Sequence, residues 1–361
     1  MFRGILALIV LGMAASAADS ADLKNYAKAK LQEFSIDLPE QMWDGGMEPG
    51  TPNPAYDKLD ELFKCDSDGK PLPVDPAIAD KAIAEFCAGP APVFERDYSM
   101  GMANGCFNMY RAIYRATRYN REQIEREDDD GAFRRMQQNF IIGRWMLEHD
   151  DLLGFAMGRS IVAHTLKAVA PRIKDFSAEQ LASIRDDLSG IAAAISTQAK
   201  RTLAAEIAEV VVTASYYEQL KLSGETTILK RKFGDYSHWE ELFEKAVKGG
   251  IELMRIYEMP VPERIAALRR FDRTFYRTTG GKDDKKLLMD SHLIYNFTRF
   301  EDTIGFYRTA IEMEITRRKS GAFPNPVPGI DPYTGKPFEF KNGVLSGAGT
   351  DLTHQPLLLK L

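Results

Sequence analysis

Cysteine is scarce in this chain, which has only Cys65, Cys87 and Cys106 among 361 residues. These residues lie 22 and 19 positions apart with no histidine beside them, whereas a zinc site needs close pairs of ligands. Their number is odd, so at least one thiol stays free or bridges to another molecule. The sequence leaves open whether two of them form a disulfide or all three remain buried thiols.

The chain also lacks an excess of positive charge and a long hydrophobic run. It has 47 Lys and Arg against 52 Asp and Glu, a net charge of -5, so nucleic acid and anionic membrane surfaces are not expected as main partners. Its apolar run from Ile5 to Met13 is about half of the roughly 20 residues that span a bilayer.

That short apolar run has the layout of a cleavable export signal. Arg3 precedes it, and the small residues Ala15, Ser16 and Ala17 follow as an A-x-A cleavage site. We predict a signal peptide over residues 1–17, export to the periplasm or beyond the cell, and no membrane span after cleavage. The processing signal of pilins is absent, because Ile9 stands where those proteins have Glu after the cut at Gly4.

Motifs that carry catalysis are missing too. The chain has no H-E-x-x-H, no C-x-x-C and no G-x-S-x-G, and its five histidines fall in separate segments. The remaining catalytic candidates are His149, within Glu148-His149-Asp150-Asp151, and His164. Glu206 and Glu209 join them because paired carboxylates in an apolar run act as acid and base when one pKa rises. Salt bridging on a half-exposed face is the alternative for the two glutamates.

Two further charged patterns are candidates for binding. Arg269, Arg273 and Arg277 step by four and form a basic stripe that suits an anionic ligand, although the interleaved aromatic residues favour a core-facing helix. Asp128-Asp129-Asp130-Gly131 begins like a calcium loop, but it lacks the bidentate Glu that closes such a loop. We therefore expect a turn or a helix cap there.

Helical spacing of apolar residues recurs along the chain, and no alternating run of strand length occurs before residue 320. We predict an all-α fold, a multi-helix bundle or irregular helical array, over residues 18–320. The expected helices cover residues 21–34, 53–64, 75–88, 103–119, 131–149, 151–169, 237–258 and 261–277. Residues 37–54, rich in Pro and Gly, are expected to form a loop.

Two longer helices complete this prediction. One begins at Ser177, whose hydroxyl is placed to cap it, and continues to Leu222 as a single helix or as two with a kink near Gly190. The other has a stripe of seven large apolar residues, and its opposite face, including Asp302, is expected to meet solvent. The stripe consists of Leu293, Phe297, Phe300, Ile304, Tyr307, Ile311 and Ile315.

After Lys319 the composition changes to turn-forming residues. In Asp331-Pro332-Tyr333-Thr334-Gly335 the Asp is able to bond its own backbone, Pro fixes φ, and Gly supplies a positive φ. We predict a turn and β-hairpin module over residues 321–361, docked at the end of the long helix.

This tail resembles the C-terminal region of major pseudopilins of type II secretion. It also resembles a broad group of uncharacterised exported all-helical bacterial proteins, with further similarity at residues 84–99, 131–171 and 176–188. The matching tail residues are Gly321, Phe323, Pro324, Asp331, Pro332, Tyr333, Gly335, Pro337, Phe338, Phe340, Ser346, Gly349 and Asp351.

The pseudopilin resemblance implies a calcium ion at Asp351. Here the loop has one extra residue between Ser346 and Asp351, and no acid follows Asp351, although calcium takes six to eight oxygen ligands. We therefore predict no cofactor, with calcium at Asp351 as the alternative.

The sequence favours a non-enzymatic, exported binding or structural component of the cell envelope, with an envelope protein or polymer as partner. One alternative is a hydrolase or metal-dependent enzyme with its site inside the helical bundle. Another is a secretion or pilus accessory protein that uses the pseudopilin-like tail. The oligomeric state stays open.

Overall fold

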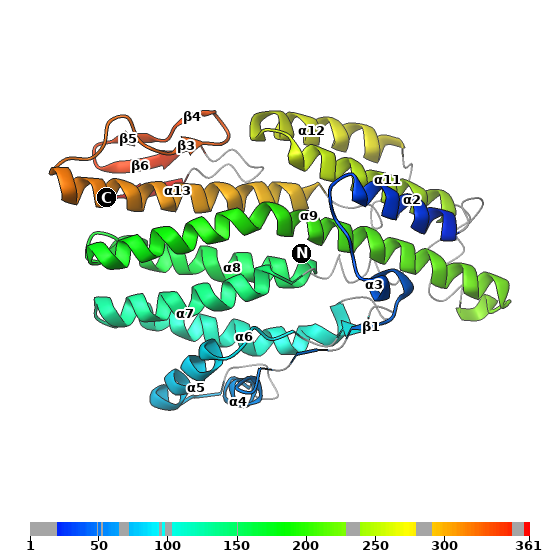
Figure 1. Ribbon diagram of the computed structural model, residues 1–361, viewed down its shortest axis with the longest axis horizontal. Helices are drawn as coiled ribbons and strands as arrows, with labels where there is room; N and C mark the ends of the chain where they lie inside the picture. The colour runs from blue at the N-terminus through cyan, green and yellow to red at the C-terminus, as the bar shows by residue number, and fades with distance from the viewer. Residues whose placement is uncertain are drawn as a thin grey trace. The chain divides into compact units, whose positions relative to one another are not determined.

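The computed structural model describes residues 20–48, 50–51, 53–64, 72–93, 96–97, 103–149, 151–228, 239–278, 291–348 and 357–361. They are mostly helical, with a small antiparallel sheet near the C-terminus (Figure 1). The predicted fold class is therefore confirmed. The predicted signal peptide, Asp351 and Cys65 lie outside the described residues. None of the described helices combines the length and the apolar character that crossing a bilayer requires.

The chain divides into two compact units. The first takes the described residues within 1–49, 95–106 and 200–294, and the second takes those within 50–94, 107–199 and 295–361. Helix α9 (Ala178–Leu222) contributes residues 178–199 to the second unit and 200–222 to the first. It is one helix of 45 residues that continues through Gly190, so the single-helix alternative of the prediction is confirmed.

The first unit contains α2 (Ser20–Gln32), α3 (Glu40–Asp44), α11 (Trp239–Glu258), α12 (Val261–Thr278) and the second half of α9. Helix α11 contacts both α2 and α12. It buries Phe243, Val247, Ile251 and Met254, which recur at helical spacing.

The stretch predicted as a loop contains α3, which begins after Pro39 and ends at Gly45, where φ is +66°. It also contains β1 (Met47–Glu48), which pairs with β2 (Arg96–Asp97). A two-residue strand is held by backbone hydrogen bonds. It is too short to show the alternation of apolar and polar residues from which a strand is predicted.

The second unit contains α4 (Tyr56–Leu62), α5 (Pro76–Ala88), most of α6 (Ala103–Ile124), α7 (Asp129–Leu147), α8 (Leu152–Val169), the short 3₁₀ helix η2 (Ala170–Arg172), the first half of α9 and most of α13 (His292–Ser320). Helices α7 and α8 pack closely because glycine lies at their contact. A Cβ on Gly158 would stand 2.6 Å from the carbonyl oxygen of Gly143.

Helix α13 confirms the predicted stripe, with Phe297, Phe300, Ile304 and Ile311 each at most 2% exposed. The expectation that its opposite face meets solvent is wrong at Asp302, which is 2% exposed. The reason is that α13 is covered on more than one side. Its N-terminal half packs on α8, where the ring of Phe155 lies 4.6 Å from that of Phe297, and its C-terminal half packs on the tail.

The tail forms two small antiparallel sheets beside α13 (Figure 1). Strands β3 (Ile330–Asp331) and β4 (Lys336–Pro337) pair in one, and β5 (Glu339–Lys341), β6 (Val344–Gly347) and β7 (Leu357–Lys360) lie in that order in the other. Phe338 packs edge-on against Phe306 of α13, with their ring centroids 5.5 Å apart. The module is therefore docked on the helix, with this contact midway along α13, whereas the prediction placed it at the end of the helix.

The turn at Asp331 forms as its residues require. Asp331 is 3% exposed, and its Oδ1 accepts hydrogen bonds from the backbone of Tyr333 at 2.8 Å and Thr334 at 3.3 Å. Its Oδ2 accepts one from Ala348 at 2.6 Å, and Gly335 has φ +67°. The carboxylate thus links the β3–β4 turn to the end of β6.

Candidate functional site

A groove of about 620 Å³ opens on the second unit where α7 and α9 begin and α13 ends. Aspartates of α7 and arginines of α13 both line it, so it carries charge of both signs. The lining residues are Asp128, Asp129, Asp130, Lys174, Asp175, Phe176, Ser177, Gln180, Arg317 and Arg318.

The α7 wall begins with a helix cap. Oδ1 of Asp128 accepts a hydrogen bond from the backbone N–H of Gly131 at 2.8 Å, which makes Asp128 the N-cap of α7. The expectation of a cap in this acidic run is therefore confirmed.

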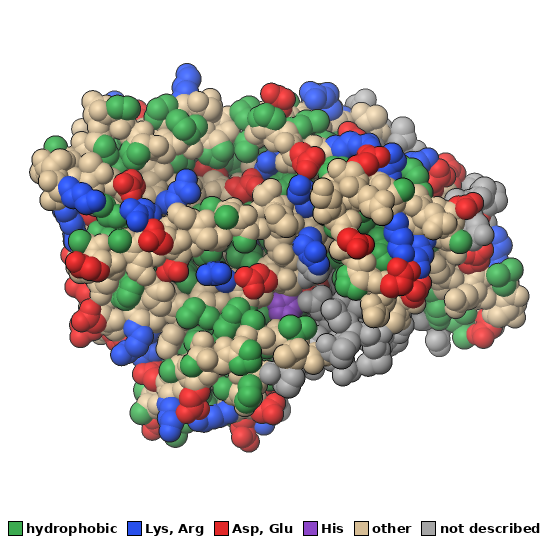
Figure 2. Space-filling view, viewed as in Figure 1, with side chains coloured by type: hydrophobic (Ala, Val, Ile, Leu, Met, Phe, Trp, Pro, Cys, Tyr) green, Lys and Arg blue, Asp and Glu red, His purple; other side chains and the backbone are tan. Residues whose placement is uncertain are grey.

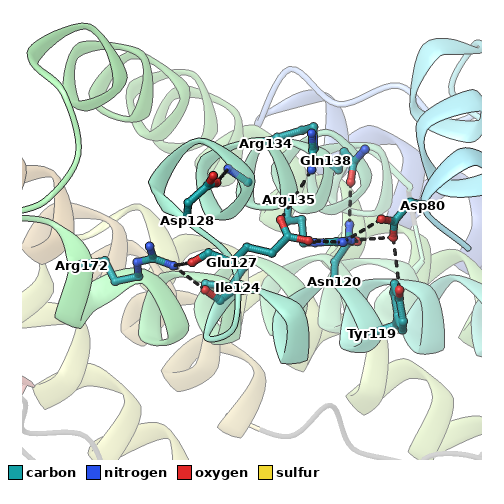
Figure 3. Close-up of polar contacts among 11 residues, drawn as sticks. Asp80, Tyr119, Asn120, Ile124, Glu127, Asp128, Arg134, Arg135, Gln138 and Arg172 are labelled. Atoms are coloured by element: carbon teal, nitrogen blue, oxygen red, sulfur yellow. Dashed lines mark hydrogen bonds and ion pairs between the residues drawn. The ribbon is translucent and has the colours of Figure 1, made fainter. Parts of the chain in front are cut away.

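A buried arginine holds the turn between α6 and α7. Arg135 is 4% exposed, and its Nε donates to Oε1 of Glu127 at 2.7 Å (Figure 3). Both of its Nη atoms donate to the carboxylate of Asp80 on α5, each at 2.9 Å, and Nη1 also donates to Asn120. The turn is thereby tied to α5 and α6.

The positive charge of Arg135 is paired with negative charges inside this network. Burial alone would lower the pKa of Arg135, but hydrogen bonds to Asp80 and Glu127 outweigh it, and the pKa lies above its ordinary value. Tyr119 donates its hydroxyl to Asp80 at 3.2 Å, and the Arg135 guanidinium lies 5.6 Å from the Tyr119 ring. The network thus fixes the backbone next to the groove.

A second arginine secures the same turn from η2. Nη1 of Arg172 donates to the carbonyl oxygens of Ile124 at 2.7 Å and Glu127 at 2.8 Å (Figure 3), and Nη2 donates to Asp129. These carbonyls lie at the end of α6, where no further helical turn supplies donors.

The opposite wall is built around Glu314 of α13, which is 1% exposed. It accepts hydrogen bonds from Arg317 at 2.6 and 2.7 Å and from Arg318 at 2.8 Å. Burial would raise the pKa of Glu314, but these two arginines outweigh it and hold the pKa below its ordinary value. Arg318 also donates to the carbonyl oxygens of Lys174 and Phe176, so it fixes the loop before α9.

The start of α9 is a capping box. The backbone N–H of Gln180 donates to Oγ of Ser177 at 3.1 Å, and the backbone N–H of Ser177 donates to Oε1 of Gln180 at 2.8 Å. Nε2 of Gln180 also donates to Asp130 at 2.8 Å. Both walls and the helix starts are therefore held by internal contacts, and the groove is preorganised.

His149 and its neighbour Asp151 have structural contacts at the joint between α7 and α8. His149 is 5% exposed, its ring packs edge-on against Tyr110, and its carbonyl oxygen accepts from Gln198 at 3.0 Å. Asp151 caps α8 through Gly154 at 2.6 Å and accepts the Tyr110 hydroxyl at 2.8 Å. Asp150 lies outside the described residues.

The other three catalytic candidates occupy different places. His164 is exposed on α8, about three turns after the start of that helix, with Nδ1 3.1 Å from Oγ of Ser160. Glu206 and Glu209 are half-buried on α9 and belong to the first unit, whereas both histidines belong to the second. Within the described residues, no group of three or more His, Cys, Asp and Glu side chains is arranged to hold a metal ion.

The predicted basic stripe lies on α12. Arg269 and Arg273 are exposed there, and Nε of Arg273 donates to the carbonyl oxygen of Arg269 at 2.9 Å. The Arg277 side chain lies outside the described residues, so a ligand at this stripe stays a prediction.

Of the three cysteines, the structure describes the side chain of Cys87 alone. Cys87 is a half-buried free thiol whose Sγ lies 3.7 Å from the carbonyl oxygen of Gln138, and burial raises its pKa to about 12. Such a thiol stays protonated at neutral pH and is a poor nucleophile. The side chain of Cys106, like Cys65, lies outside the described residues.

The fold and these sites define a two-unit, mainly helical protein with a charged surface groove. Comparison of the chain with protein families, with curated proteins and with solved structures gave no match.

Proposed function

We propose that the protein is an exported, non-enzymatic component of the cell envelope that binds another protein in the charged groove of the second unit. The groove's mixed charge carries this proposal. A uniformly anionic polymer placed along it would meet Asp129 and Asp130, whereas a polypeptide is able to set basic groups against α7 and acidic groups against α13.

The rigidity of the groove supports the same proposal. Its walls are fixed by Arg135, Arg172, Glu314 and Arg318, so little conformational entropy remains to be lost when a partner binds. The side chains of Lys174 and Asp175 remain exposed between these walls. They are the residues best placed to meet a partner without disturbing the fold.

The test is site-specific photocrosslinking in cells. A photoreactive residue at Lys174 is expected to give one discrete adduct with an envelope protein. The same residue at Lys81, an exposed position on α5 outside the groove, is expected to give none. Adducts of equal yield at both positions, or an adduct with a glycan, would overturn the groove as a protein-binding surface.

The partner, once identified, allows a charge-swap test. The double change Lys174→Glu with Asp175→Lys keeps the net charge and inverts the local pattern, so we expect at least about tenfold weaker binding with an unchanged circular dichroism spectrum. Turnover of an ester, peptide or glycan by homogeneous protein would contradict the non-enzymatic role.

Export predicts a mature N-terminus at Ala18 in secreted material.

A further inference from the structure

One surface of α8 carries a cluster of positive charge. Ser160, His164 and Lys167 follow at spacings of four and three residues, so they share a helix face, and Arg159 directly precedes them. Arg121 of α6 acts electrostatically on His164. On the face drawn in Figure 2, basic and acidic side chains are interspersed, whereas the charged residues that act on His164 and Arg159 are all basic.

Arg159 is the most buried charged residue of this cluster. Its side chain is partly buried, and Nη1 donates to Oδ1 of Asn296 on α13 at 2.9 Å. No ion pair joins Arg159, Arg121 or Lys167 to a carboxylate of the described residues. Burial and then the positive charge of Arg299 lower the pKa of Arg159, the opposite of what is found at Arg135.

The histidine beside it reports the same excess of positive charge. Partial desolvation of the ring, then Arg121, and further Lys167 and Arg159, lower the pKa of His164, while the contact with Ser160 opposes them. The charged groups that act on the ring all come from α6 and α8. An anion placed among them would reverse the electrostatic part of this shift and raise the pKa of His164.

A partly buried guanidinium without a carboxylate is costly, since the lost hydration is not replaced by an opposite charge. Arg159 has donors beyond Nη1 for oxygen atoms, and Arg121 and Lys167 bring two further charges that do not titrate near neutral pH. A ligand that satisfies this set has a compact group with several oxygens and more than one negative charge. A phosphate group fits that description better than a single carboxylate.

We infer that Arg121, Arg159, His164 and Lys167 form a binding site for a phosphate group, either free or carried as a monoester. Arg159 donates to the phosphate oxygens and Asn296 holds its guanidinium in place. Arg121 and Lys167 supply long-range attraction. His164 takes up a proton as the ligand binds, because the added negative charge stabilises imidazolium.

Calorimetric titration of the full mature chain with inorganic phosphate tests the site, with acetate at equal ionic strength as the control anion. We expect phosphate to bind and acetate to bind at least about tenfold more weakly. Glycerol 3-phosphate in a parallel titration separates the two sources. Binding at least as tight as that of inorganic phosphate identifies a monoester site, and binding of inorganic phosphate alone identifies a site for the free ion. Equal affinities for phosphate and acetate would overturn the ligand class.

Matched variants on α6 locate the site. Arg121→Gln is expected to weaken phosphate binding at least about fivefold, whereas Arg118→Gln, one turn earlier and paired with Glu122, leaves it unchanged. An equal loss of phosphate affinity in both variants would mean that only the net charge of the protein matters, and it would overturn the site. The groove variant with Lys174→Glu and Asp175→Lys serves as a second control, because phosphate binding on α8 does not depend on the groove.

The histidine gives a readout that survives if an Arg159 variant fails to fold. The ring resonances of His164, assigned with His164→Gln, are followed from about pH 5 to about pH 8, with and without saturating sulfate. Sulfate is used because it does not titrate in this range. We expect the His164 pKa to lie below 6.5 in the free protein and to rise on saturation. An unchanged pKa at saturation would overturn the inference.

Discussion

Arg135 and Arg159 are both withdrawn from water within the second unit, yet their surroundings are opposite. Arg135 lies between the carboxylates of Asp80 and Glu127, and these raise its pKa despite burial. Arg159 has one neutral acceptor, Asn296, and a positive neighbour, and its pKa falls. One arginine is thus neutralised by the protein itself, whereas the other has no counterion in the part of the chain that the structure describes.

This difference separates structure from function in physical terms. Breaking a buried ion pair by removing one partner leaves an unpaired charge and costs stability, so residues around Arg135 are expected to matter for folding. A charge that is unpaired in the free protein carries no such contribution. The phosphate proposed for this site would supply the opposite charge.

The largest expected effect is therefore at Arg135. Arg135→Met keeps an unbranched apolar stem but removes the guanidinium that pairs with Asp80 and Glu127. We expect a loss of about 3 kcal/mol in the free energy of unfolding, at the lower end of the range for buried pairs, since the two carboxylates are 40% and 24% exposed. Urea denaturation followed by circular dichroism measures it. Glu85→Ala, which removes an exposed pair with Lys58, is the control and should stay within about 0.5 kcal/mol.

Glu314 is the acidic counterpart of Arg135. Glu314→Gln keeps the shape but weakens the bonds from Arg317 and Arg318, and we expect a loss of about 2 kcal/mol at neutral pH. Because the folded pKa of Glu314 is depressed, its contribution is present above the unfolded pKa and disappears as pH falls through the folded value. The wild-type protein should therefore lose more stability on acidification than the variant. Parallel acid profiles of the two would contradict this assignment.

A smaller effect is expected where a neutral group completes the groove. Ser177→Ala removes the hydroxyl that caps α9, and we expect a loss of about 1 kcal/mol in the free energy of unfolding. Ser189→Ala is the control, since Ser189 lies within α9 and its hydroxyl bonds the carbonyl of Arg185 instead of a free N–H group. If Ser189→Ala lowered the free energy of unfolding as much as Ser177→Ala, capping by Ser177 would not explain the loss.

The sequence predicted the helices of this fold well because their apolar spacing and caps are local signals. The side chains of Ser177, Asp128 and Asp331 each accept a hydrogen bond from a backbone N–H group two or three residues later. Their roles are therefore predictable from the local sequence. The stripe of α13 was predicted correctly for the same reason. The burial of Asp302 was not predicted, because an apolar stripe on one face gives no sign that α13 is covered on more than one side.

The sites were much less predictable. Arg135 meets Asp80 across 55 positions and Arg318 meets Phe176 across 142, and no local pattern relates such residues. Arg159 could not be distinguished from a solvated helix residue, since the chain gives no sign of which charges lack partners. His164 was singled out in the sequence as a catalytic candidate, but the groups that surround it are cations from α6 and α8.

The smallest effect on stability is expected at Arg159, and it is the sharpest test of the comparison. Arg159→Met removes a guanidinium that has no carboxylate partner among the described residues. The desolvation cost of that charge disappears with it, and only the Asn296 amide is left to be solvated, so the free energy of unfolding should fall by no more than about 0.5 kcal/mol without ligand. Thermal unfolding of wild type and variant, with and without inorganic phosphate, measures both terms. Phosphate should raise the melting temperature of the wild type and leave that of Arg159→Met unchanged, because only a ligand that binds the folded state stabilises it. A loss near that of Arg135→Met would mean that Arg159 has a structural role after all, and the contrast between the two arginines would fall.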